Sequence, residues 1–518
     1  MIFFPLSKTR PETLLHMAVS FGPNSGGRTK AVFQRSATIS NRWPDQCIIT
    51  LNHRMEYRTI FESWAKQHKL PSSVRMRNMF EEIAGETLYL AADKLVTFNL
   101  PSRATPTKDP LRWMMIDAAQ QRQFTLRDDG SLAHVKRWTS GLYDQLDRFD
   151  RASMLRVRET RKNDTLLHTE YYRSNGQPFI QVLAPTDRTG TTVRVFGGLY
   201  DTSGEHVDLE HLRKRWIASL CGQFDNPIAF IDDRDADDLL IKNVWLEKTV
   251  PTIAIIHSSH LRSPYTNIES VNDFNGRAIA QANRFSTMIF LTQEQLDDVK
   301  SVYECPNGQV IPHAVEGPKK RGRTAKSLQT FVLATRLVKL KQIDEVIQAF
   351  ALLLVRFPKA KLHIWGTGEE ERALKKLVKE LCIGKNVKFK GYTKSPESAL
   401  RGAAASIMTS KYEGFSLALM EALSNGVPVI CYRFRYGPNA MVRHGLNGYL
   451  VDSGNVEALA DAMAKILIRP IRSRFMGLCA RTIRLTNSRR RIGRRWEQVI
   501  LSVTDKRDCA TSDSHRSN

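Results

Sequence analysis

Short apolar segments alternate with amphipathic helical segments throughout the second half of the chain. Its predicted strands are Thr330–Ala334, Lys361–Trp365, Val387–Lys390, Ala404–Met408 and Val427–Cys431. Apolar residues at helical spacing predict helices at Gln342–Leu354 and Glu369–Leu381. Alternating strands and helices are typical of a doubly wound parallel α/β domain, whose ligands bind outside the carboxyl ends of the strands. We therefore look for binding residues directly after these strands.

The N-terminal half has the same order, interrupted by a segment with a different pattern. Strands are predicted at Leu14–Phe21, Cys47–Leu51, Val74–Met79, Ile228–Ile231 and Thr252–Ile256, with a helix at Tyr57–His68. Between about Thr107 and Glu205 the turn signals are typical of β-hairpins: Arg127–Ser131, Arg173–Gln177 and Thr189–Gly190. These patterns predict a second α/β domain with an inserted antiparallel β subdomain.

Size and charge restrict the class of protein. A chain of 518 residues can form two or three domains, and a formal net charge of +24 attracts polyanions and anionic membrane surfaces. The start, Met1–Leu6, lacks the basic region of a secretory signal, and no apolar run approaches the roughly 18 residues needed to span a bilayer. We expect a cytoplasmic protein, with contact at the inner face of the membrane as a further expectation. The 7 scattered cysteines fit reduced thiols and not a zinc module.

The run Glu413-Gly414-Phe415-Ser416 is predicted to form a turn, and the apolar helix that follows it contains Glu421. Gly414 lets the backbone approach a ligand, Ser416 is expected to cap the helix, and the free amides at its start favour a diphosphate. Two carboxylates beside a diphosphate site suggest a nucleotide-sugar. If both were helical they would lie about 12 Å apart, whereas glycosidase pairs lie about 5 to 9.5 Å apart. The alternative is two solvated glutamates that flank an amphipathic helix.

Two further candidates follow strands of the C-terminal half. Arg336 and Lys341 come after Thr330–Ala334, where they could clamp a diphosphate, although an exposed basic loop would look the same. Gly366 opens the turn after Lys361–Trp365 as part of an incomplete glycine fingerprint. That turn is as well explained by a structural role as by contact with a nucleotide.

His257 and His260 follow the strand that ends at Ile256, so at least one imidazole should lie at the rim of the domain. Zinc binding is not expected, because the sequence offers no third ligand for this pair. Asp232-Asp233-Arg234-Asp235 could mimic an acidic metal motif, but a polar loop at a strand end is the simpler interpretation. We predict no metal site.

Several of these segments together resemble retaining glycosyltransferases of family 4, which have the GT-B fold. The resemblance rests on Gly26-Gly27, His257 with His260, Arg336 with Lys341, the segment from Glu413 to Glu421, and Asn425–Ile430. Tyr436–Asn439 and His444–Val451 resemble the subgroup of poly(glycerol-phosphate) α-glucosyltransferases and adhesin Ser/Thr glycosyltransferases, which carries a β-rich insertion.

The resemblance implies metal-independent transfer from a UDP-sugar with retention at the anomeric carbon. Arg336 and Lys341 would hold the diphosphate, Glu413 the donor sugar, and Glu421 the ribose. Gly26 and Gly27 would give the donor room, and His257 or His260 would face the sugar and acceptor. Gly366, Gly414, Phe415 and Ser416 complete the expected donor site. No cofactor is expected besides the donor itself.

Domain limits and partners complete the expectations. The predicted segments are an N-terminal domain in two parts (1–106 and 206–317), an inserted β subdomain (107–205), a nucleotide-sugar domain (318–480), a basic helix (481–505) and a disordered tail (506–518). A hinge is expected near 316–328.

The expected acceptor is a polyanionic poly(glycerol/ribitol-phosphate) polymer, and the alternatives are a Ser/Thr-rich protein or a catalytically silent binding subunit. A homo-oligomer through the β insertion is also expected, and nucleic acid is not.

Overall fold

The computed structural model describes most of the chain. Described residues are 12–22, 27–86, 97–117, 119–185, 191–241, 243, 244, 246, 249–315, 329–393, 395–400 and 402–516, without the side chains of 396 and 506–516. The expected hinge at 316–328 lies outside this part. Internal contacts divide the chain into one unit of Met1–Ser25, Trp43–Ala229 and Asp235–Val250, and a second of Gly26–Arg42, Phe230–Arg234 and Pro251–Asn518.

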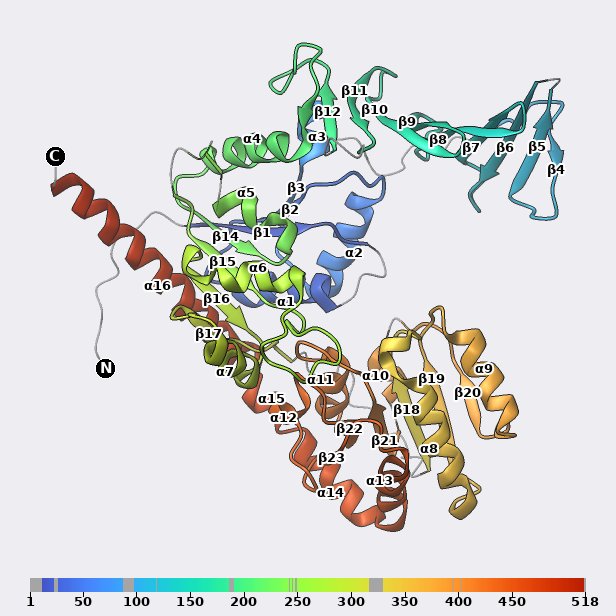
Figure 1. The fold of residues 1–518 in the computed structure, drawn as a ribbon, viewed down its shortest axis with the longest axis vertical. Helices are drawn as coiled ribbons and strands as arrows, with labels where there is room; N and C mark the ends of the chain where they lie inside the picture. Colours follow the sequence, from blue (N-terminus) through green and yellow to red (C-terminus); the bar gives the residue numbers. More distant parts are fainter. Residues whose placement is uncertain are drawn as a thin grey trace. The chain divides into compact units, whose positions relative to one another are not determined.

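The first sheet has the strand order β17-β16-β15-β14-β1-β2-β3 (Figure 1). Its strands are β1 (Thr13–Val19), β2 (Gln46–Thr50), β3 (Val74–Asn78), β14 (Pro227–Ile231), β15 (Thr252–Ile255), β16 (Thr287–Phe290) and β17 (Gly308–Val310). The accompanying helices are α1 (Gly27–Ile39), α2 (Tyr57–His68), α3 (Met79–Ala84), α4 (Leu209–Gly222), α5 (Asp237–Ile241), α6 (Asp273–Ala280) and α7 (Gln293–Val302). β1 pairs with β2, β2 with β3, β15 with β16, and β16 with β17, all in parallel. The predicted N-terminal α/β sheet is therefore confirmed.

A second, antiparallel sheet occupies the part of the sequence where hairpins were predicted. Its order is β13-β12-β11-β10-β9-β8-β7-β6-β5-β4. Its strands are β4 (Thr105–Pro106), β5 (Arg112–Ile116), β6 (Gln120–Leu126), β7 (Leu132–Thr139), β8 (Leu142–Phe149), β9 (Leu155–Lys162), β10 (Thr165–Tyr172), β11 (Pro178–Leu183), β12 (Thr192–Val195) and β13 (Val207–Asp208). The turn signal Arg127–Ser131 joins β6 to β7, and Arg173–Gln177 joins β10 to β11. The third signal, Thr189–Gly190, lies outside the described residues.

The third sheet is parallel and has the order β20-β19-β18-β21-β22-β23. Its strands are β18 (Thr330–Ala334), β19 (Lys361–Trp365), β20 (Val387–Phe389), β21 (Ala405–Met408), β22 (Val429–Tyr432) and β23 (Gly448–Val451). The helices are α8 (Ile343–Arg356), α9 (Glu371–Glu380), α10 (Pro396–Leu400), α11 (Leu417–Ser424), α12 (Pro438–Met441), α13 (Val456–Ile468), α14 (Pro470–Ala480) and α15 (Ile483–Thr486). Phe331, Val346 and Phe350 are fully buried in the core between sheet and helices. The doubly wound C-terminal domain predicted from periodicity is thus confirmed.

The last helix, α16 (Arg489–Arg516), differs from the predicted basic helix and tail. It begins later than expected, because residues 483–486 form α15, and its backbone continues through most of the segment expected to be disordered. Ile492, Trp496 and Ile500 are buried along one face of α16. Buried side chains at this spacing nucleate a helix, which then extends at little cost per added residue.

Among the residues described here, no helix combines the length and apolar character needed to cross a membrane. The six cysteines whose side chains are described are free, as expected for reduced thiols.

Candidate active site

A lysine and a glutamate meet beyond the carboxyl end of β18. Lys341 lies in a short 3-10 turn (Lys339–Lys341), and its Nζ forms an ion pair with the Glu413 carboxylate. Lys341 Nζ also donates to Ser410 Oγ at 3.3 Å, and Ser410 Oγ donates to Glu413 Oε1 at 3.1 Å. Because these side chains are largely buried, the pair presents a fixed cation and carboxylate at the edge of the sheet where ligands bind in α/β domains.

Backbone geometry explains the glycine in the turn after Glu413. A Cβ on Gly414 would lie 2.0 Å from the carbonyl oxygen of His257, so only glycine fits this approach. Ser416 precedes α11 with φ 65°, and its side chain makes no cap hydrogen bond. The predicted capping role of Ser416 is therefore wrong, because the hydroxyl instead lies 2.9 Å from Met408 Sδ. The first amides of α11 keep the orientation that favours an anion.

Glu421 on α11 forms an ion pair with Lys30 of α1. Sequence reasoning did not identify Lys30, and its only local signal is its place one turn after the glycine loop. Gly27 lies nearby, since a Cβ there would be 3.4 Å from Leu417 Cδ1. Gly26 falls outside the described residues.

A buried charge network lies at the carboxyl ends of β14 and β15. Asp232 accepts two hydrogen bonds from the Arg35 guanidinium, at 2.8 and 2.5 Å, and one from His257 Nε2 at 2.7 Å. Burial opposes ionisation of Asp232, but the Arg35 charge outweighs it and holds the pKa of this carboxyl well below its usual range. Since Asp232 is ionised, the proton of the neutral His257 ring is held on Nε2. Burial lowers the pKa of His257, against the opposing effect of Asp232.

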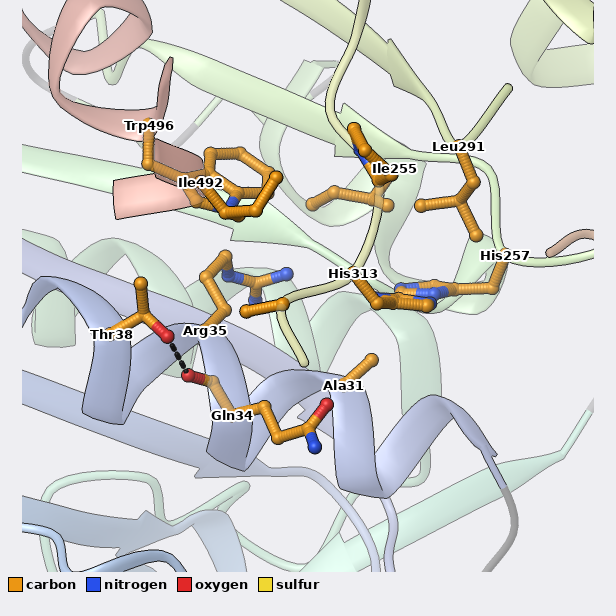
Figure 2. Close-up of a pocket in the computed structure, with 12 residues that line it drawn as sticks. Ala31, Gln34, Arg35, Thr38, Ile255, His257, Leu291, His313, Ile492 and Trp496 are labelled. Carbon is orange, nitrogen blue, oxygen red and sulfur yellow. Dashed lines mark hydrogen bonds between the residues drawn. The ribbon is translucent and has the colours of Figure 1, made fainter. Parts of the chain in front are cut away.

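His313 extends this network toward the Glu413 turn. Its ring stacks on His257 with centroids 6.0 Å apart and contacts Phe415 edge-on at 5.5 Å. Figure 2 shows the two imidazoles face to face at one side of a pocket, with Ile492 and Trp496 of α16 at another side. His313 and Arg35 were not identified from the sequence, because neither belongs to a local motif.

His260 has a different environment from His257. Its ring is fully buried and stacks on Tyr436 with centroids 5.7 Å apart. Within the described residues neither ring nitrogen has a hydrogen-bond partner, and burial lowers the pKa of His260 to about 4. Tyr436 in turn donates to Asp298 Oδ2 at 2.6 Å, and Arg435 pairs with the same carboxylate. Of the two histidines, only His257 is joined to the charge network.

The two remaining predicted residues differ in surroundings. Arg336 is exposed and forms no ion pair with any residue that the structure describes. Gly366 has φ 130°, and a Cβ there would lie 1.8 Å from the carbonyl oxygen of Thr335. Close packing of two backbone segments thus suffices to explain this glycine. The helix after it begins at Glu371, not at Glu369 as predicted.

The acidic run after β14 forms ion pairs. Asp233 pairs with Arg28 at 2.7 Å, as Asp232 does with Arg35. Within the described part of the chain, no group of three or more His, Cys, Asp or Glu side chains is arranged to hold a metal ion.

Comparison with known proteins finds relatives among glycosyltransferases. The sequence is 34% identical over 266 residues to the poly(glycerol-phosphate) alpha-glucosyltransferase of Bacillus subtilis (strain 168), covering 50% of this chain but only 39% of that protein. It is 23% identical over 479 residues to the poly(ribitol-phosphate) alpha-N-acetylglucosaminyltransferase of Staphylococcus aureus (strain COL), covering 88% of this chain and 93% of the relative.

Solved structures agree over nearly the whole chain. S. aureus TarM matches with a TM-score of 0.72 at 19% identity, covering 94% of this chain and 98% of that one. The pneumococcal O-GlcNAc transferase GtfA, solved with UDP and GlcNAc, matches with a TM-score of 0.77 at 16% identity, covering 96% and 100%. The chain therefore has the GT-B fold. Within that class, residues 318–482 match the family Glycosyl transferases group 1.

Proposed function

We propose that this protein transfers a hexose or N-acetylhexosamine from a UDP-sugar to a hydroxyl acceptor, with retention at the anomeric carbon. The observation that carries the proposal is the Lys341–Glu413 pair beyond β18, beside the start of α11. A buried cation and free helix amides match a diphosphate, and a neighbouring carboxylate matches sugar hydroxyls.

The proposed roles follow from charge and position. Lys341, exposed Arg336 and the α11 amides stabilise the leaving diphosphate, which makes a metal ion unnecessary. Glu413 accepts hydrogen bonds from the hydroxyls of the donor sugar. Glu421 accepts hydrogen bonds from the ribose after the Lys30 side chain has moved away from its carboxylate. Gly366 and Phe415 line the donor site, and Gly26 and Gly27 leave room for the donor. His257 faces the sugar and the acceptor, with buried His260 as the alternative.

Retention follows from attack on the face that the diphosphate leaves. The acceptor oxygen forms the new bond to the anomeric carbon while the bond to the diphosphate breaks, and a phosphate oxygen takes the hydroxyl proton. The chain's own contribution is to orient both substrates and to stabilise the departing charge.

The proposed acceptor is a poly(glycerol/ribitol-phosphate) polymer. Two relatives named above act on such polymers by their names, and the net charge of +24 suits a chain of phosphates. The second candidate is a Ser/Thr-rich protein acceptor, favoured by the match to GtfA across 96% of the chain. Raising ionic strength should weaken binding to a polyanion through screening, whereas binding to a neutral protein chain should change little.

The direct test measures UDP release from a panel of nucleotide-sugars, with and without each acceptor. Glu413→Gln and Lys341→Ala should each lower turnover by roughly a hundredfold or more, the scale for losing one group that stabilises developing charge. Lys339→Ala is the matched control, because Lys339 is an exposed lysine in the same turn. Near-normal turnover in both site variants would refute the assigned site, and no turnover with any donor would favour a silent binding subunit.

We further propose a cytoplasmic protein in contact with the inner face of an anionic membrane, and a homo-oligomer formed through the antiparallel sheet. Exposed apolar side chains on that sheet include Ile116, Leu142 and Leu167. Light scattering on a chromatographed sample measures the oligomeric state, and a monomer at all concentrations would refute the oligomer.

A further inference from the structure

Helix α14 exposes large apolar side chains on the face that points away from the protein. Ile471, Phe475 and Leu478 are 82%, 56% and 61% exposed. Positions spaced by four and three residues lie on one side of a helix, so these three form a continuous ridge, here called the α14 ridge. Met476 and Ala480, on the opposite face, are buried. The inner face alone is therefore enough to hold α14 on the domain, and the ridge contributes no burial.

Basic residues surround the α14 ridge, and acidic residues are absent from the sequence around it. Between 462 and 496 the sequence has eleven Lys and Arg and no Asp or Glu. Arg469, Arg472 and Arg474 are exposed and form no ion pair with any residue in the described part of the chain. On a helical projection, Arg472 and Arg474 lie on either side of Phe475, so cations border the ridge on both sides.

An exposed apolar ridge bordered by arginines is the combination expected of a helix that lies at an anionic membrane surface. We propose that α14 binds the surface of an anionic lipid bilayer, with Ile471, Phe475 and Leu478 entering the boundary between headgroups and acyl chains and the arginines contacting lipid phosphates. A second copy of this chain is a poor occupant, because two faces rich in arginine would repel each other. A dissolved polyanion would satisfy the arginines but leave the apolar ridge in water.

The proposal names the helix that makes the membrane contact proposed above. It rests on the proposed location at the membrane and does not depend on sugar transfer. Every residue named lies outside the candidate active site. Failure of vesicle binding would therefore leave the transferase proposal standing, and failure of transfer would leave the vesicle result standing.

The test is sedimentation of the full chain with vesicles of phosphatidylglycerol and phosphatidylcholine, compared with vesicles of phosphatidylcholine alone. The wild type should sediment with the anionic vesicles and not with the neutral ones. Replacing the ridge in one variant (Ile471→Ser, Phe475→Ser, Leu478→Ser) or two cations in another (Arg472→Glu, Arg474→Glu) should lower binding by about tenfold or more. Val355→Ser is the matched control, because Val355 is an 84% exposed apolar residue on α8.

Thermal unfolding separates a binding defect from misfolding, since the changed side chains are exposed and each variant should melt like the wild type. The proposal is overturned if the wild type ignores anionic vesicles or if both variants bind like the wild type. It is also overturned if light scattering shows an oligomer that the ridge variant dissociates, since the ridge would then be a contact between copies.

Discussion

At the scale of single residues, the described site depends on a few groups whose partners are far away in the sequence. Asp232 joins Arg35 on α1 to His257 after β15, and the missing side chain of Gly414 leaves room for the carbonyl oxygen of His257. Position along the chain predicted that His257 would follow a strand and that Glu413 would lie in the turn before a helix. It did not reveal that the backbones of the two segments touch, because that contact depends on packing.

Replacing Asp232 with Asn should impair both folding stability and proposed catalysis. Arg35 would lose its buried counter-charge, which costs about 3–5 kcal/mol of unfolding free energy, measured by urea denaturation. A neutral amide in place of the carboxylate would also hold the tautomer of His257 less firmly, so kcat should fall more than KM rises, and the pH profile should shift. Asp273→Asn is the control, since Asp273 has a highly exposed side chain in an ion pair with Arg262. Equal stability losses in the two variants would contradict this account.

Replacing Gly414 with Ala should disturb the site by steric overlap. The added Cβ would lie 2.0 Å from the His257 carbonyl oxygen, so one of the two segments must move. A displacement of about 1 Å in a catalytic group can cost roughly a hundredfold in rate, which donor turnover assays would detect. Gly384→Ala is the matched control, because a Cβ there meets nothing within 4 Å. Similar turnover in both variants would count against the proposed positions of Glu413 and His257.

At the scale of elements, periodicity predicted five of the six strands of the C-terminal sheet, because they are short apolar runs bounded by turns, and it missed β23 (Gly448–Val451). Periodicity was less accurate for the last helix, because its many arginines make the buried apolar face hard to recognise in the sequence. Trp496 of α16 lies edge-on to Phe230 with centroids 5.7 Å apart, and the Arg35 guanidinium lies 5.5 Å from the tryptophan ring centroid. This helix therefore supports the residues that hold Asp232.

Truncation of Trp496 to Ala should lower the unfolding free energy by about 3–5 kcal/mol, the usual cost of emptying a buried aromatic site. Chemical denaturation with intrinsic fluorescence at another tryptophan, or with circular dichroism, provides the measurement. Leu501→Ala on the same helix should cost much less, because Leu501 is 40% exposed. A larger loss for Leu501 than for Trp496 would contradict the orientation of α16.

At the scale of the whole molecule, buried neutral histidines make stability depend on pH. Burial lowers the pKa of His260 to about 4 and that of His313 to about 3, from 6.5. As the pH falls below about 6.5, these histidines bind protons in the unfolded chain but stay neutral in the folded chain. Stability is therefore fully retained above that pH and is lost on acidification, by up to about 3 kcal/mol for His260 as the pH approaches 4.

His260→Phe should reduce this acid sensitivity and leave stability near pH 7 unchanged or higher, because both unpaired ring nitrogens are removed while the stacking on Tyr436 is kept. Urea denaturation at pH 7 and near pH 4.5 measures the slope of the unfolding free energy against pH. His206→Phe, at an exposed position, should keep the slope of the wild type. Identical slopes in the two variants would show that His260 is not the group responsible.

The amino-acid order by itself determined the α/β alternation, the inserted hairpins, the placement of Lys341 and His257 after strands, and the placement of Glu413 in the turn before a helix. Those features depend on side-chain periodicity and turn chemistry within about ten to twenty neighbouring residues.

Only the tertiary structure decided which charges pair, since Lys30 and Glu421 are 391 positions apart and Arg35 and Asp232 are 197 apart. Partners this distant are selected by the packing of α1, α11 and the strand ends, because a charge is stable in the interior only where folding brings an opposite charge within hydrogen-bond distance.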